Sequence, residues 1–210
     1  MTIDKDDEAL NEAHRQKMQE LKAQQAAAVK ERTEKRGITL VHTGDGKGKS
    51  TAAFGLALRA AGVGFKVLVV QFTKGKWKTG EGKMLGTLPG VEHVIVGDGF
   101  TWNTQDRRAD IEAAEAGWQV CVDAIEASRG ENPKYDLIIM DELNIILRYD
   151  YLDVAKVVEA VKNKPVDLHL CITGRDAKPE LIEVADTVTE FKKVKHAYDA
   201  GIKAMRGIEF

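Results

Sequence analysis

The sequence is poor in cysteine, proline and aromatic residues. Its 210 residues include 2 cysteines, 4 prolines and a 6% share of aromatic side chains. Cys121 and Cys171 stand far apart in apolar stretches, and no cysteine or histidine pair has the spacing of metal ligands. These shortages exclude a disulfide scaffold and a cysteine-based metal site. We expect both cysteines to be small buried hydrophobic residues.

An excess of charge of one sign is missing as well. The 31 lysines and arginines are balanced by 33 aspartates and glutamates, so no overall basic field attracts nucleic acid or anionic lipid. No apolar run approaches the roughly 18 residues of a membrane span, and the first residues lack the apolar stretch of a secretion signal. We therefore expect a cytoplasmic protein that binds neither nucleic acid nor a membrane.

Glycine and proline are absent from residues 1–36. In this segment eight basic residues balance eight acidic ones, and strong helix formers dominate. Its apolar side chains form only a thin stripe, made of Leu10, Met18, Leu21 and Val29. The pattern predicts a long charged helix, an N-terminal arm over 1–36 that is too polar for a core. Such an arm is either solvated or a flap or dimer clasp, and the sequence favours neither.

From residue 37 onward, short apolar runs alternate with helical patterns. Expected strands lie at 38–42, 66–72, 93–96, 137–140, 168–173 and 187–191, and expected helices at 50–61, 110–128, 152–163 and 179–185. This alternation predicts an α/β domain over 37–210, a largely parallel sheet with helices on both faces. Ligands of such sheets bind beyond the carboxyl ends of the strands.

A glycine-rich segment, TGDGKGKST at 43–51, follows the first expected strand. The phosphate-loop pattern is glycine, four residues, Gly-Lys and then Ser or Thr; Gly48, Lys49 and Ser50 fit it, but Thr43 replaces the first glycine and Gly44 comes one place later. Backbone N–H groups and a helix N-terminus would hold a polyphosphate, Lys49 would reach its oxygens and Ser50 would ligate Mg²⁺. The alternative is a ligand-free turn. The coincidence of all these features favours an ATP or GTP site in a RecA-like P-loop NTPase fold.

A pair of acidic residues farther along the chain supports this interpretation. Asp141 and Glu142 follow the apolar run at 137–140, the layout of a Walker B strand, whose acid holds Mg²⁺ opposite the phosphate loop. Alternatively, Asp141 caps a helix that begins near Leu143. Together with the phosphate loop, metal binding is favoured.

The loop at 97–106 is the most informative segment beyond these motifs. It places Phe100 and Trp102 two residues apart among glycine and polar residues, an arrangement that favours contact with a ligand or partner over anchoring on the core. No Asn-Lys-x-Asp motif of a GTPase is present.

Six segments together resemble the ATP:corrinoid adenosyltransferases of the bacterial cobalamin pathway, also called cob(I)yrinic acid a,c-diamide adenosyltransferases. They are TGDGKGKSTAAFG at 43–55, VVQFTKG at 69–75, GDGFTWNTQD at 97–106, MDELN at 140–144, ITGR at 172–175 and VKHAYDAGIKAMRGIEF at 194–210. The resemblance runs from the charged N-terminal helix to the last residue. Two departures are Ser50, where Thr is common, and Asp45, where Asn is also seen.

The resemblance implies a reaction in which Co(I) of a reduced corrinoid attacks C5′ of ATP and triphosphate leaves. The triphosphate-binding residues that it implies are Gly44, Asp45, Gly46, Lys47, Gly48, Lys49, Ser50 and Thr51. Lys49 would act in catalysis; Ser50 and Glu142, with Asp141 as a second candidate, would hold Mg²⁺ or alternatively Mn²⁺. Arg59 and Arg175 are secondary candidates for nucleotide contacts. The shift from Thr43 to Gly44 suggests the hypothesis that ATP lies reversed in the loop.

On the corrinoid side, the resemblance places Phe100 and Trp102 under the corrin ring as catalytic residues. There they would displace the lower axial ligand, so that a flavoprotein such as flavodoxin can reduce Co(II). The N-terminal helix would cover the corrinoid, and the protein would be a homodimer.

Two other functions stay open from the residues alone. A P-loop small-molecule kinase or ATPase would release ADP or phosphate instead of triphosphate. A non-enzymatic nucleotide-binding or corrinoid-carrier protein would release no triphosphate when Co(I) is supplied.

Overall fold

The computed structural model describes residues 5–73, 79–96 and 106–209. The chain divides into two units, Met1–Lys35 and Arg36–Phe210. In the first unit, α1 (Lys5–Lys30) is a single helix of 26 residues, and the apolar side chains of its thin stripe are exposed. The helix therefore ends before the predicted arm does, and Arg36 belongs to the second unit.

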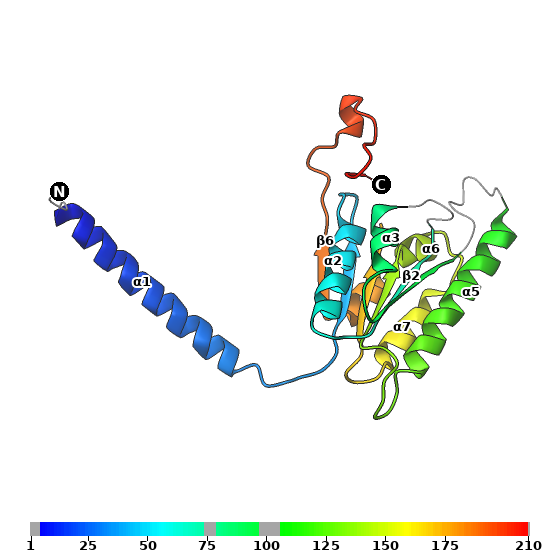
Figure 1. The fold of residues 1–210 in the computed structure, drawn as a ribbon, viewed down its shortest axis with the longest axis horizontal. Coiled ribbons are helices and arrows are strands. Elements are labelled where there is room, and N and C mark those ends of the chain that lie inside the picture. Colours follow the sequence, from blue (N-terminus) through cyan, green and yellow to red (C-terminus); the bar gives the residue numbers. More distant parts are fainter. Residues whose placement is uncertain (1–4, 74–78, 97–105, 210) are drawn as a thin grey trace. The chain divides into compact units, whose positions relative to one another are not determined.

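The second unit is built on a sheet of six parallel strands in the order β3-β2-β4-β5-β1-β6 (Figure 1). The strands are β1 (Thr39–Thr43), β2 (Val67–Gln71), β3 (Val91–Ile95), β4 (Leu137–Asp141), β5 (His169–Thr173) and β6 (Thr187–Glu190). The helices are α2 (Lys49–Gly62), α3 (Gly80–Leu85), α5 (Arg107–Glu126), α6 (Leu143–Arg148), α7 (Val154–Lys162) and α8 (Pro179–Val184), with a short 3₁₀ turn at Tyr198–Ala200. The predicted α/β class and parallel sheet are confirmed.

Helices cover both faces of the sheet because the central strands are apolar on both sides. Every residue of β2 and β4 is buried. Alternate residues such as Val67 and Val69 pack in the layer of α2 and α3, whereas Leu68 and Val70 pack in the layer of α5 to α8. Cys171 lies in the first layer and Cys121 in the second, both fully buried as the sequence predicts.

The structure differs from the sequence-based expectation in one helix. The segment after β2 looks like a loop in sequence, because glycine, lysine and threonine dominate it, but α3 begins within it at Gly80. Thr79 caps this helix by accepting a hydrogen bond from the Gly82 amide. The cap and the burial of Leu85 compensate for the poor helix propensity of the glycines.

After β6 the chain leaves the sheet and returns to the loop between β1 and α2 (Figure 1). Residues 191–209, the C-terminal segment, include the 3₁₀ turn and end near this loop, where Glu209 forms an ion pair with Lys47. In the described part of the chain, no helix has both the length and the apolar character needed to span a bilayer.

Candidate active site

The loop between β1 and α2 has the backbone form that its glycines predict. Gly44 and Gly48 have φ of 96° and 109°, in the left-handed region that favours glycine. A Cβ on Gly44 would lie 2.5 Å from the carbonyl oxygen of Phe191, and one on Gly46 would lie 2.8 Å from the backbone of Lys192. These two glycines are therefore required by the close approach of the C-terminal segment.

Lys49 lies at the centre of this phosphate loop. Its Nζ donates hydrogen bonds to the carbonyl oxygens of Gly44 and Gly46, both at 2.7 Å. Burial lowers the pKa of the Lys49 ammonium; the Glu142 carboxylate opposes this effect and Arg175 adds to it. A buried cation and a neighbouring carboxylate thus meet where the sequence predicts a phosphate and metal site.

Phe191 braces the loop from the edge of the sheet. Its amide donates to the Thr43 carbonyl (2.8 Å), and its carbonyl accepts from the Gly46 amide (2.6 Å). Its ring lies 5.5 Å from that of His42. The Thr43 hydroxyl also accepts a hydrogen bond from the Ala177 amide at 3.0 Å. Thr43 therefore has a structural partner at the position where the usual pattern has glycine, and the Gly46 N–H is engaged within the protein.

The two acids after β4 differ in their surroundings. Asp141 is fully buried, and its two carboxylate oxygens accept hydrogen bonds from Gln71 Nε2 (2.8 Å) and Thr173 Oγ1 (2.7 Å). Glu142 is half-buried, has a φ of 65° and precedes α6 without a side-chain hydrogen bond to the helix. Asp141 does not cap α6, contrary to the alternative considered from the sequence. Glu142 is the acid that is better placed to ligate a cation.

The hydroxyl of Ser50 and the carboxylate of Glu142 are both oxygen donors, the kind of group that suits Mg²⁺. Oxygen ligands are what Mg²⁺ prefers, and it usually takes one or two from protein and the rest from substrate phosphates and water. No group of three or more His, Cys, Asp or Glu side chains that could hold a metal by itself occurs in the described residues. The site therefore fits an ion shared with a polyphosphate.

Of the two arginines predicted to contact the nucleotide, one lies beside the phosphate loop and the other does not. Arg175 follows β5 and lies 3.8 Å from Asp45, with both side chains more than half exposed, so this ion pair contributes little stability. Arg59 lies in the last turn of α2, roughly 14 Å along the helix from Ser50 at 1.5 Å per residue, so the structure does not bring it to the loop. Phe100 and Trp102 lie outside the described residues.

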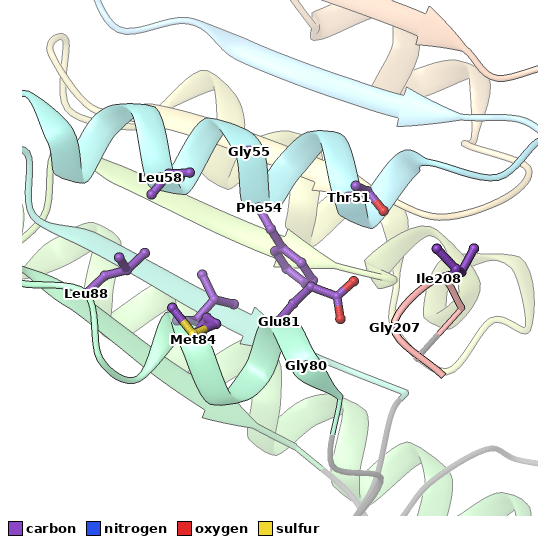
Figure 2. A pocket seen from close by; sticks show the side chains of 11 residues that line it. Thr51, Phe54, Gly55, Leu58, Gly80, Glu81, Met84, Leu88, Gly207 and Ile208 are labelled. Atoms are coloured by element: carbon purple, nitrogen blue, oxygen red, sulfur yellow. The ribbon is translucent and has the colours of Figure 1, made fainter. Parts of the chain in front are cut away.

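An apolar cavity of about 580 Å³ opens beside the phosphate loop, between α2 and α3. Figure 2 shows Thr51 and Ile208 at one end of it and Leu58 and Leu88 at the other. Because Thr51 directly follows Ser50, the cavity adjoins the phosphate loop. The C-terminal segment therefore contributes both to the brace on the loop and to the rim of this cavity.

The geometry agrees with comparisons to known proteins. The model of the family "ATP:corrinoid adenosyltransferase BtuR/CobO/CobP" matches residues 35–210. The chain belongs to this family. The corrinoid adenosyltransferase of Pseudomonas aeruginosa is 45% identical over 201 residues, 95% of this chain and 97% of the relative. Those of Escherichia coli K12 and Salmonella typhimurium, the latter named CobA, are 43% identical over 95% of this chain and 99% of theirs.

Sequence reasoning missed several residues of this adenosyltransferase-family site. Gln71 carried a signal, because a polar residue ends an otherwise apolar strand, and it lies in the VVQF segment. Phe191 carried none, because a hydrophobic residue at the end of a strand is ordinary. Its contacts with Thr43 and Gly46 arise from the pairing of β6 with β1, which joins residues about 150 positions apart.

Proposed function

We propose that this chain transfers the 5′-deoxyadenosyl group of ATP to Co(I) of a reduced corrinoid. The electron pair of Co(I) forms the cobalt–carbon bond to C5′ while the C5′–O bond breaks, and its electrons leave with triphosphate. The observation that carries the proposal is the phosphate loop with its buried Lys49, found in a chain that matches the adenosyltransferase family over 35–210.

The described side chains suit a triphosphate leaving group. Negative charge grows on the triphosphate as the C5′–O bond breaks, and the Lys49 ammonium, held at the phosphate loop, and the N-terminus of α2 would stabilise it. A general base is unnecessary, because Co(I) carries no proton to remove.

Mg²⁺ is part of the proposal, with Mn²⁺ as the alternative. Ser50 and Glu142 would hold the ion. Asp141 would support Glu142 without contacting the ion itself. When bound, the ion would neutralise charge on the triphosphate.

Further parts of the proposal are supported by the family resemblance. Phe100 and Trp102 would lie under the corrin ring, a flavoprotein such as flavodoxin would reduce Co(II), and the enzyme would work as a cytoplasmic homodimer in adenosylcobalamin synthesis or salvage. We expect Phe100→Ala or Trp102→Ala to slow adenosylation from Co(II) strongly while ATP affinity is kept. Unchanged rates with the flavoprotein reductant would contradict this role.

The test is anaerobic incubation with ATP, Mg²⁺ and chemically reduced cobalamin. We expect the absorption spectrum of adenosylcobalamin to appear together with one triphosphate per corrinoid. ADP and phosphate as products would point to the kinase or ATPase instead, and no triphosphate release would point to a carrier protein. For the Lys49→Ala variant, the matched control is Lys162→Ala, an exposed lysine in the last turn of α7, which should form adenosylcobalamin like the original protein.

A further inference from the structure

Four side chains on neighbouring strands form a continuous hydrogen-bonded row: Gln71, Asp141 and Thr173 are the last residues of β2, β4 and β5, and His93 lies in the middle of β3. His93 Nε2 and Gln71 Oε1 are 2.7 Å apart, Gln71 Nε2 donates to Asp141 Oδ2 (2.8 Å), and Thr173 Oγ1 donates to Asp141 Oδ1 (2.7 Å). The row therefore crosses β3, β2, β4 and β5. It ends on Glu142, whose amide donates to Thr173 Oγ1 at 3.0 Å.

The parallel register explains why these side chains meet. Gln71 pairs with Asp141, and Met140 pairs with Ile172, so that Asp141 and Thr173 stand in the same row. Gln71, Asp141 and Thr173 lie two residues beyond Val69, Ile139 and Cys171 of the α2-side core, hence on the same face of the sheet. His93 pairs with Val69 and therefore lies on this face as well, one step before the strand ends. The polar row therefore lies at the carboxyl end of this core. Asp141, Gln71 and Thr173 are all at most 2% exposed.

The hydrogen-bond directions within the row are fixed by chemistry. An ionised carboxylate only accepts, so the Gln71 amide must turn its NH₂ group toward Asp141 and its oxygen toward His93. His93 Nε2 is then the donor in their contact. In this orientation both ends of the Gln71 amide have a partner, whereas a flipped amide would turn its oxygen toward the Asp141 carboxylate, which has no hydrogen to donate.

Thr173 occupies the decisive position at the end of the row. Its one hydroxyl holds the Asp141 carboxylate as a donor and the Glu142 amide as an acceptor. Glu142 needs this support because its φ of 65° is uncommon for a residue with a side chain. Loss of the hydroxyl would free the peptide that aims the Glu142 carboxylate.

We propose that Thr173 and Gln71 are positioning residues for the metal-binding carboxylate of Glu142. Thr173 fixes the backbone of Glu142, and Gln71 fixes the Asp141 carboxylate to which Thr173 is bound. Neither residue touches the metal. This inference rests on the part of the proposed function that gives Glu142 to Mg²⁺.

The experiment measures Mn²⁺ affinity in the presence of ATP by electron paramagnetic resonance. Thr173→Val keeps the shape of the side chain and removes the hydroxyl; we expect it to weaken Mn²⁺ binding on the order of 10- to 100-fold, as for other groups that orient metal ligands. Thr173→Ser, which keeps the hydroxyl, should restore affinity to within about threefold of the original. Metal-free ATP binding should be the same in all three proteins.

Thr39→Val is the matched control. Thr39 is a buried strand threonine at 1% exposure, and its hydroxyl has no hydrogen-bond partner in the described structure, so its removal should leave Mn²⁺ affinity unchanged. If Thr173→Val does not fold, Gln71→Met, which keeps the length but not the amide, is expected to weaken Mn²⁺ binding in the same direction.

A double-mutant cycle with Glu142→Gln decides whether Thr173 acts through Glu142. In the Glu142→Gln background, Thr173→Val should cause no further loss of Mn²⁺ affinity. An equal loss in both backgrounds, or no loss in either, would overturn the inference. Failure of the proposed function would look different, because the wild-type protein would then make no adenosylcobalamin whatever its Mn²⁺ affinity.

Discussion

At the scale of single residues, Lys49 is the cation that we propose to bind the triphosphate. In the free chain, its ammonium donates to two carbonyl oxygens of the phosphate loop. The motif made this residue predictable, since a lysine after a glycine-rich turn at a helix N-terminus has a known chemistry. An acid opposite the loop was predictable as well, from the Walker B layout at Asp141 and Glu142. The hydrogen bonds of Lys49 to the Gly44 and Gly46 carbonyls were not, because the motif does not specify which partners the ammonium has.

We predict that Lys49→Ala lowers ATP affinity roughly 10- to 100-fold, the equivalent of a lost hydrogen bond to a charged group. Turnover should fall as well, because charge on the leaving triphosphate loses its cation. Isothermal titration with ATP and steady-state kinetics measure the two effects. Normal kinetics in this variant would contradict the assignment of the loop to triphosphate.

Asp186 is a second residue whose environment gives a prediction. Arg36 Nη1 donates to Asp186 Oδ2 at 3.0 Å, and the Thr39 amide donates to the same carboxylate at 2.8 Å, so that the residues before β1 and β6 are tied together. The hydrogen bond from Arg36 is the main cause that lowers the pKa of Asp186; burial opposes it. The stabilisation is therefore present above the ordinary carboxyl pKa and is lost as the pH falls through the lowered value.

We expect Asp186→Asn to reduce the free energy of unfolding by about 1 kcal/mol at pH 7, because the charged pair becomes a neutral contact. Below about pH 4, the ordinary carboxyl pKa, the difference from the original protein should begin to shrink, and it should keep shrinking as the pH falls through the lowered pKa of Asp186. Urea unfolding at a series of pH values measures this. A difference that stays constant down to pH 2.5 would refute the role of the charge.

At the scale of elements, the phosphate loop is shaped by its neighbours as much as by its own sequence. Gly46 has no room for a Cβ because the backbone of Lys192 lies 2.8 Å away, whereas Gly55 in the middle of α2 has nothing within 4 Å. The phosphate-loop motif could be recognised in the sequence, but the brace by Phe191 could not.

Substitution by alanine should therefore harm ATP binding at Gly46 and stabilise the fold at Gly55. Gly46→Ala must displace either the loop or the C-terminal segment, so we expect ATP affinity to fall at least about tenfold. Gly55→Ala should raise the free energy of unfolding by about 0.5–1 kcal/mol, because alanine favours a helix interior. Calorimetric ATP titration and urea unfolding of both variants check this; equal effects would contradict it.

At the scale of the whole second unit, composition indicates which strands are central but not the order of all six. The alternation of apolar runs and helices predicts a parallel sheet, and the most apolar strands are the central ones, β2, β4 and β5. The order β3-β2-β4-β5-β1-β6 could not be derived, because apolar runs pair equally well with several partners. The return of the C-terminal segment to the phosphate loop was equally hidden.

The two thiols are buried on opposite sides of the sheet, so the labelling rate of each one reports how often its own side opens. Burial raises the pKa of Cys121, in α5, and raises that of Cys171, in β5, to about 12. Alkylating reagents attack thiolates, so each cysteine reacts only when its own side of the sheet opens. The phosphate loop leads directly into α2, and Cys171 lies in the layer of this helix. ATP with Mg²⁺ should therefore slow iodoacetamide labelling of Cys171 more than that of Cys121, as peptide mass spectrometry would reveal. Equal protection would mean that both sides of the sheet open in one step.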